Sequence, residues 1–165
     1  MKALIAVASR HGSTIELGRR LGAVLGERGL DVRVSPAEKV ESLNGYSVVV
    51  LGSAVYASKM LPTMTALAYR WRDQLARRAT YLFCSGPVDA PDPSAAPLPH
   101  DARQLVRISG IRDARMFGGA VFFDRLRPTE RASMRMWGTN PGDYRDWDRV
   151  VEWGEQIADD VLGRV

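Results

Sequence analysis

The sequence predicts a single α/β domain, spanning residues 1–165, in which helices cover both faces of a parallel β-sheet. Three observations lead to this prediction. Short runs of β-branched residues alternate with longer segments whose apolar residues recur at helical spacing. No two strand-like runs follow one another as a hairpin, so we expect helices to join the strands. The length suits one domain, and the sequence contains neither an internal repeat nor a low-complexity tract.

Five strand-like runs are expected to form the sheet. The first, Lys2–Ala8, is an almost continuous apolar run, which is typical of a strand with both faces covered. The third, Tyr46–Ser53, is the most strand-like stretch of the chain. The expected strands are residues 2–8, 31–35, 46–53, 80–84 and 114–122.

The segments between these strands have helical periodicity and recognisable end signals. Gly29 stands where a C-terminal cap belongs, Pro62 is placed to begin a helix, and Asp146 is placed to cap one. The expected helices are residues 14–28, 62–75, 101–109 and 146–162, with one further turn within 36–43. Residues 86–99 contain five prolines and no periodicity, so they are expected to form a loop. The expected buried residues are Leu17, Leu21, Val24 and Leu25 in the first helix, Leu61, Met64, Leu67, Ala68, Trp71 and Leu75 around the second, and Trp147, Val150, Val151, Gly154, Ile157, Ala158, Val161 and Leu162 in the last.

The composition bears on location and partners. The net charge is +4, and nearly all of the basic residues are arginine, which reflects either genomic base composition or an affinity for anions. The arginines are scattered and no nucleic-acid-binding motif accompanies them, so no nucleic acid is expected as a partner. The single cysteine, Cys84, excludes an internal disulfide and a cysteine-based metal cluster. No apolar run approaches the ~18 residues of a membrane span, and no signal-peptide pattern is present, so we expect a cytoplasmic protein.

The turn after the first strand carries the clearest functional signal. Ligands of open parallel sheets bind beyond the carboxyl ends of the strands. This turn offers three hydroxyl groups and a glycine, contains no acidic residue, and leads into a helix whose first amides attract anions. It therefore predicts a phosphate site, the plainer alternative being a capped helix start. Its residues are Ser9, Arg10, His11, Gly12, Ser13 and Thr14.

Other phosphate-binding or phosphoacceptor sites can be tested against the same turn. A dinucleotide fingerprint needs three spaced glycines, but only Gly12 is present. A nucleoside-triphosphate loop needs Gly-Lys followed by Ser or Thr, and a phosphoacceptor receiver domain needs acidic residues after the first strand; both features are absent. The phosphate of a mononucleotide remains.

Two further segments follow strands at the same edge of the predicted sheet. The one after the third strand combines small residues with Tyr56, which suits a planar ring, although Tyr56 could equally pack in the core. The one after the fourth strand would supply backbone groups to the other edge of the ring. The candidate residues are Ser53, Ala54, Val55, Tyr56 and Ala57 in the first segment, and Ser85, Gly86, Pro87 and Val88 in the second.

These motifs resemble the flavodoxin superfamily. The turn matches its phosphate loop at Ser9, Gly12 and Thr14, and departs from it at His11. Within the superfamily the chain is similar to the subgroup of menaquinone-dependent protoporphyrinogen IX dehydrogenases, on the runs Val49-Val50-Leu51-Gly52 and Tyr144-Arg145-Asp146-Trp147. The resemblance implies a flavodoxin-like three-layer sandwich with strand order 2-1-3-4-5, and FMN as the cofactor.

The resemblance also carries functional expectations. It implies an FMN-dependent oxidoreductase with a small-molecule or quinone redox partner, and no catalytic protein residue because the flavin does the chemistry. The basic charge suits a carrier flavodoxin poorly, since those are acidic. The alternatives are such an electron carrier, or a protein that binds a related cofactor such as a deazaflavin.

The segment Asp124–Arg145 is shorter than the insertion of the porphyrinogen-oxidising members. Its arginines, methionines and Trp137 suit contact with a membrane surface or a substrate carboxylate, which would place the protein at the periphery of the inner membrane. The plainer interpretation, which we prefer, is a solvated loop with its apolar residues tucked beneath it.

Overall fold

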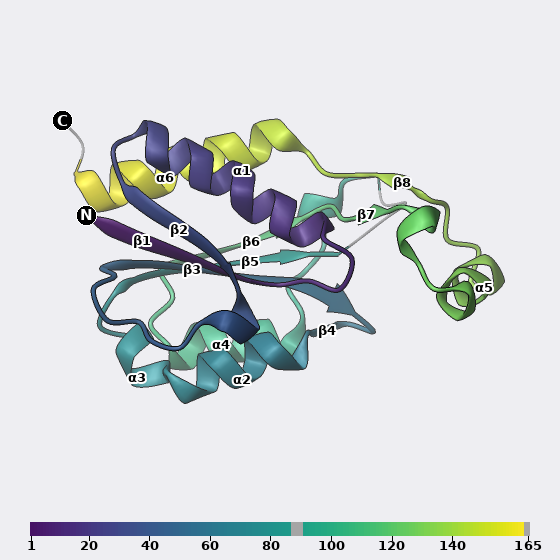
Figure 1. Cartoon of the computed structure of the whole chain (residues 1–165), viewed down its shortest axis with the longest axis horizontal. Helices are drawn as coiled ribbons and strands as arrows, with labels where there is room; N and C mark the ends of the chain where they lie inside the picture. The colour runs from purple at the N-terminus through teal and green to yellow at the C-terminus, as the bar shows by residue number, and fades with distance from the viewer. Residues whose placement is uncertain (87–90, 164–165) are drawn as a thin grey trace.

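The computed structural model describes residues 1–86 and 91–163, and its centre is a parallel β-sheet (Figure 1). The strands are β1 (Lys2–Ala8), β2 (Asp31–Pro36), β3 (Val48–Tyr56), β4 (Lys59–Met60), β5 (Ala79–Ser85) and β6 (Asp113–Phe117). The parallel strands lie in the order β2-β1-β3-β5-β6, and β4 pairs antiparallel with the end of β3. When the antiparallel β4 is left out, β5 and β6 are the fourth and fifth strands of the chain. The predicted strand order 2-1-3-4-5 is therefore confirmed.

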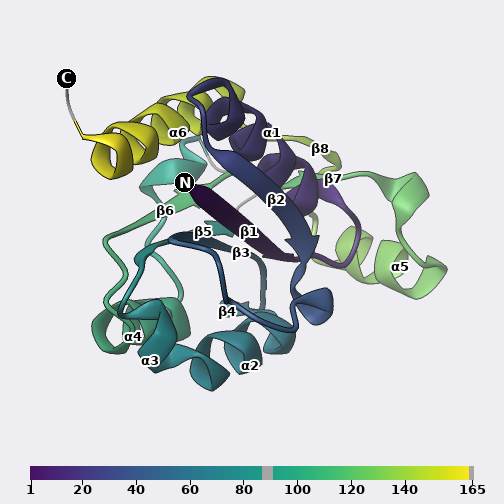
Figure 2. The ribbon, with the colours of Figure 1, turned by 60° about the vertical axis from the view of Figure 1, so that its left-hand side comes forward.

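Helices cover both faces of this sheet. The helices are α1 (Ser13–Glu27), α2 (Pro62–Arg70), α3 (Arg72–Leu75), α4 (His100–Ile108), α5 (Pro128–Met136) and α6 (Trp147–Leu162). Figures 1 and 2 show α1 and α6 side by side on one face, and α2, α3 and α4 on the other. Helix α5 belongs to neither layer and lies beyond the end of the sheet. The predicted three-layer sandwich is therefore confirmed.

Alternate residues of the central strands face the two helical layers, as the pleat of a strand requires. In β1, Ile5 packs in the core under α1 and α6, whereas Leu4 packs in the core under α2 and α4. Every residue predicted to be buried in the first helix and around the second is buried. In α6 the agreement is partial, because Leu162 is 43% exposed and Trp153, which was not predicted on the inner face, is buried.

Two predicted elements are interrupted. The expected helix 62–75 breaks at Trp71, which leaves helical geometry while its side chain stays in the core. The expected strand 114–122 ends at Phe117, because the chain at Tyr144 crosses close to Gly118. A Cβ atom on Gly118 would lie 2.0 Å from the carbonyl oxygen of Tyr144, so only glycine fits there. Beyond this crossing, β7 (Ala120–Val121) pairs with β8 (Gly142–Asp143) in a separate small ribbon.

Short 3-10 turns complete the chain between these elements. They are η1 (Ala37–Lys39), η2 (Pro93–Ala95) and η3 (Phe123–Arg125). The turn expected within residues 36–43 is η1, and η2 lies within the expected loop 86–99. The candidate site residues Pro87 and Val88 lie outside the described residues.

Candidate functional site

The phosphate turn (residues 9–14) joins β1 to α1 at the carboxyl edge of the sheet. The Ser9 hydroxyl accepts a hydrogen bond from the Gly12 amide at 3.1 Å and so closes the turn. Gly12 has a φ of 88°, a left-handed conformation that favours glycine. No atom beyond Gly12 and its two chain neighbours lies within 4 Å of the position a Gly12 Cβ would take, so the turn is open on that side.

The start of helix α1 is unsatisfied within the described structure. The first amide that bonds within the helix is that of Glu16, which donates to the Gly12 carbonyl at 3.2 Å, and no side chain caps the helix. The amides of Ser13, Thr14 and Ile15 therefore remain available to an acceptor. These donors and the helix dipole fit a phosphate group, and a capped helix start is not what the structure shows.

The segment after the third strand begins as a continuation of that strand, beyond the predicted end at Ser53. Residues 54–56 continue β3, and the chain then turns through Ala57 and Ser58, whose φ angles are both positive, into β4. Pairing of Val55 with Met60 is what extends the strand. The Ser53 hydroxyl is buried, donates to the Ala54 carbonyl and accepts from the Leu61 amide, so it is used within the fold.

The exposed end of this hairpin meets the phosphate turn. Tyr56 is 40% exposed, and the guanidinium carbon of Arg10 lies 4.7 Å from the centre of its ring. Burial raises the pKa of Tyr56 above its usual value, while the charge of Arg10 opposes that shift. The structure thus brings together the two segments that the sequence proposed for a phosphate and for a ring.

The segment after the fourth strand is tied to the end of β6. Ser85 is buried, and its hydroxyl donates to the Gly118 carbonyl at 3.4 Å. The Gly86 amide donates to the Phe117 carbonyl at 3.2 Å. Burial raises the pKa of the neighbouring Cys84 thiol to about 12, so this residue is an inert part of the core.

Arg145 supports the phosphate turn from behind, a role that the sequence did not reveal. Its side chain is 5% exposed and lies over the Trp147 ring. It donates to the Ser13 carbonyl at 3.1 Å, to Glu16 at 2.5 Å and to Asp143 at 2.7 Å. These bonds to Arg145 are the main cause of the lowered pKa values of Glu16 and Asp143. Glu16 is the one acidic residue in the first turn of α1, and its negative charge is therefore compensated by Arg145.

The segment 124–145 contains helix α5 and is not the loop that was predicted. No residue of α5 is buried, and Met136 and Trp137 are 84% and 81% exposed. The interpretation that its apolar residues are tucked beneath a loop is wrong for these two, because α5 lies beyond the sheet edge with no layer to cover it (Figure 1). The segment still contacts the phosphate turn, since His11 lies 3.4 Å from Glu130.

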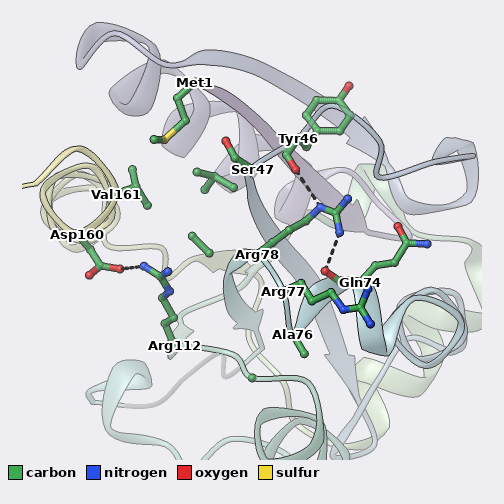
Figure 3. A pocket seen from close by; sticks show the side chains of 13 residues that line it. Met1, Tyr46, Ser47, Gln74, Ala76, Arg77, Arg78, Arg112, Asp160 and Val161 are labelled. Atoms are coloured by element: carbon green, nitrogen blue, oxygen red, sulfur yellow. Dashed lines mark hydrogen bonds and ion pairs between the residues drawn. The ribbon is translucent and has the colours of Figure 1, made fainter.

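A large cavity lies at the end of the sheet opposite the phosphate turn (Figure 3). Its volume is about 970 Å³, and it is lined by residues at the amino ends of the strands, among them Met1, Ser47 and Ala79. Arg78 in its wall donates to the carbonyls of Tyr46 and Gln74, and Arg112 pairs with Asp160 at 2.9 Å. Because its cations are largely engaged and it is remote from the phosphate turn, this cavity is not the candidate site.

No helix in residues 1–86 and 91–163 is both long enough and apolar enough to cross a membrane. The same part of the chain has no group of three or more side chains placed to hold a metal ion.

Comparison with known proteins gives one family and many structural neighbours. A family model described as "Flavodoxin domain" matches residues 4–147. No curated protein matches the sequence. Oxidised flavodoxin 1 from Bacillus cereus is 16% identical with a TM-score of 0.63, and each chain is covered over 100% of its length. A flavodoxin from Streptococcus pneumoniae TIGR4 is 17% identical with a TM-score of 0.64 and the same coverage.

A third neighbour is a larger protein. Rubredoxin oxygen:oxidoreductase from Desulfovibrio gigas has a TM-score of 0.67 and 14% identity. The match covers 98% of the present chain but 36% of that protein, so the present chain corresponds to about a third of it. At these identities the neighbours show the fold.

Proposed function

Because the chain belongs to the flavodoxin-domain family, which implies FMN as the cofactor, we propose that it is an FMN-dependent oxidoreductase. The observation that carries the proposal is the uncapped first turn of α1. It follows the open phosphate turn, and the acidic residue in it, Glu16, is paired with Arg145. The free amides at this helix end can donate hydrogen bonds to the oxygens of a phosphate group, and the helix dipole favours its negative charge.

The chain's residues would bind and orient the cofactor. The amides of Ser13 and Thr14 and the hydroxyl groups of the turn would hold the phosphate, and Tyr56 and Ala57 at the hairpin tip would lie beside the ring. When bound, the flavin supplies hydride or electron transfer. No protein side chain is assigned a chemical step.

A titration with FMN tests the cofactor directly. We expect the visible absorption of FMN to shift and its fluorescence to be quenched as the purified chain is added, with saturation at one FMN per chain. Inorganic phosphate at high concentration should compete if the turn holds the phosphate. Absence of any spectral change or of competition would contradict the assigned site. The same titration with a deazaflavin mononucleotide tests the alternative cofactor.

For the substrate, we propose a porphyrinogen or a similar hydride donor, with a quinone as the acceptor. The resemblance to protoporphyrinogen dehydrogenases and the basic segment near the site support this proposal. That segment carries Arg127 and Arg135, which suit a substrate with carboxylate groups, whereas Arg125 pairs with Glu16 and Arg131 donates to the Phe123 carbonyl. FMN-loaded protein that oxidises no porphyrinogen in the presence of a quinone would rule out this substrate while leaving the cofactor in place.

An electron carrier is the second candidate, and the full-length structural match to two flavodoxins favours it. The net charge of +4 argues for the enzyme. Reductive titration of the FMN-loaded chain separates the two. A carrier takes up its electrons in two well-separated one-electron steps, whereas the proposed enzyme takes up both in a single step.

We propose in addition that α5 contacts an anionic membrane surface through Met136 and Trp137. Their exposure and the arginines of the same helix support this, since tryptophan and basic residues suit the headgroup region. Vesicles containing anionic lipid should bind the chain and shift its tryptophan emission to the blue.

The variant Trp137→Ser is expected to weaken vesicle binding about tenfold, because one large interfacial side chain is lost. Tyr69→Ser provides the control, since Tyr69 is 43% exposed but lies on α2. Equal binding by both variants and the unaltered chain would contradict contact through α5. Binding should also fall as salt is raised.

A further inference from the structure

Arg10 is the cation of the phosphate turn whose side chain covers the hairpin tip. Arg145 and Arg125 pair with Glu16, and His11 lies beside Glu130. In the described part of the chain, no carboxylate lies within ion-pair distance of Arg10, and its side chain instead covers the Tyr56 ring.

The position of Arg10 joins the two parts of the site. Its backbone belongs to the phosphate turn, and its guanidinium carbon lies 4.7 Å from the centre of the Tyr56 ring at the hairpin tip. Glu130 is near enough for Arg10 to help lower its pKa, but that carboxylate is held by His11 and by the Arg127 amide. A ring placed at the hairpin tip therefore lies in the field of the Arg10 guanidinium.

The charge of a flavin ring depends on its redox state. Transfer of a hydride from a substrate adds two electrons and one proton to a neutral ring and leaves one negative charge on it. A nearby cation stabilises that anion and leaves the neutral oxidised ring almost unaffected. The ratio of the protein's affinities for reduced and for oxidised FMN determines how far the reduction potential of the bound cofactor differs from that of free FMN.

We propose that Arg10 raises the two-electron reduction potential of the bound flavin and so makes the ring a stronger hydride acceptor. The inference rests on the proposed function, since it requires FMN at this site. Arg10 acts here on the electronic state of the ring and has no proton or electron of its own to transfer.

The test compares Arg10→Gln with Arg20→Gln, which removes the same charge from an exposed position of α1 that lies away from the turn. The midpoint potential of bound FMN and the affinity for oxidised FMN are measured for both variants. In Arg10→Gln, the affinity for reduced FMN should fall about tenfold more than that for oxidised FMN, which lowers the potential by about 30 mV. Arg10→Lys should retain most of the potential, and Arg20→Gln all of it.

The outcomes separate this inference from the function on which it rests. If the unaltered chain binds no FMN, the proposed function itself fails. If Arg10→Gln binds FMN at an unchanged potential, or loses affinity equally for both redox states, FMN binding stands and the role assigned to Arg10 is wrong.

Discussion

Replacement of Arg145 by alanine is expected to lower the free energy of unfolding by about 3 kcal/mol. The guanidinium is 5% exposed and is bonded to Glu16, Asp143 and the Ser13 carbonyl. Its removal leaves Asp143 without this cation and Glu16 with Arg125 as its remaining partner, and it removes packing against Trp147. The value lies at the low end of the range for breaking a buried ion pair, because water can still reach the carboxylates.

Urea unfolding of the variant measures this loss, and Arg149→Ala is the matched control. Arg149 also pairs with acidic residues, but its side chain is 51% exposed, so its removal should cost less than about 1 kcal/mol. Similar losses in the two variants would show that Arg145 is an ordinary surface cation. Arg145→Ala should also weaken FMN binding, because the Ser13 carbonyl loses the group that holds the phosphate turn in place.

The same network predicts how stability depends on pH. Arg145 lowers the pKa values of Glu16 and Asp143 in the folded chain. Stability from such groups is complete above the usual pKa of an unfolded carboxyl group and is lost as the pH falls through the lowered values. The difference in unfolding free energy between the unaltered chain and Arg145→Ala should therefore be full at pH 7 and shrink as the solution is acidified.

The layered fold could be predicted from the sequence because its signals are local. The buried residues of β1 and of α1 follow one another at the spacing of their own element, so the pattern is visible without knowing the partner. The end of β3 was mispredicted for the opposite reason. Its extension depends on pairing with β4, and the turn between them uses Ala57 and Ser58 at positive φ where glycine or asparagine would have signalled a hairpin.

The candidate site likewise has a part that could be predicted from the sequence and a part that could not. The phosphate turn was predictable because its donors are consecutive in the chain and precede a helix. The support given by Arg145 was not, because Glu16 and Arg145 are far apart in sequence and meet only when α1 and the chain before α6 pack together. The contact between Arg10 and Tyr56 has the same origin, since it joins the ends of two different strands.

The variant Ser13→Glu is expected to abolish FMN binding without harming the fold. Ser13 is the first residue of α1, where a carboxylate stabilises the helix by about 0.3–1 kcal/mol through the dipole. The same carboxylate would stand beside the phosphate of FMN, and repulsion at such a distance corresponds to an affinity loss of about 100-fold or more. Stability and cofactor binding should therefore change in opposite directions.

Two further variants make this result specific to charge at the turn. Ser13→Gln has a similar size without the charge and should lose far less affinity than Ser13→Glu. Ala23→Glu introduces the same charge at an exposed position near the other end of α1 and should leave FMN binding unchanged. FMN titration and thermal unfolding of the three variants give both quantities. If Ser13→Glu binds FMN as well as Ala23→Glu does, the phosphate is held elsewhere, because no site at the amino end of α1 could accept that carboxylate without loss.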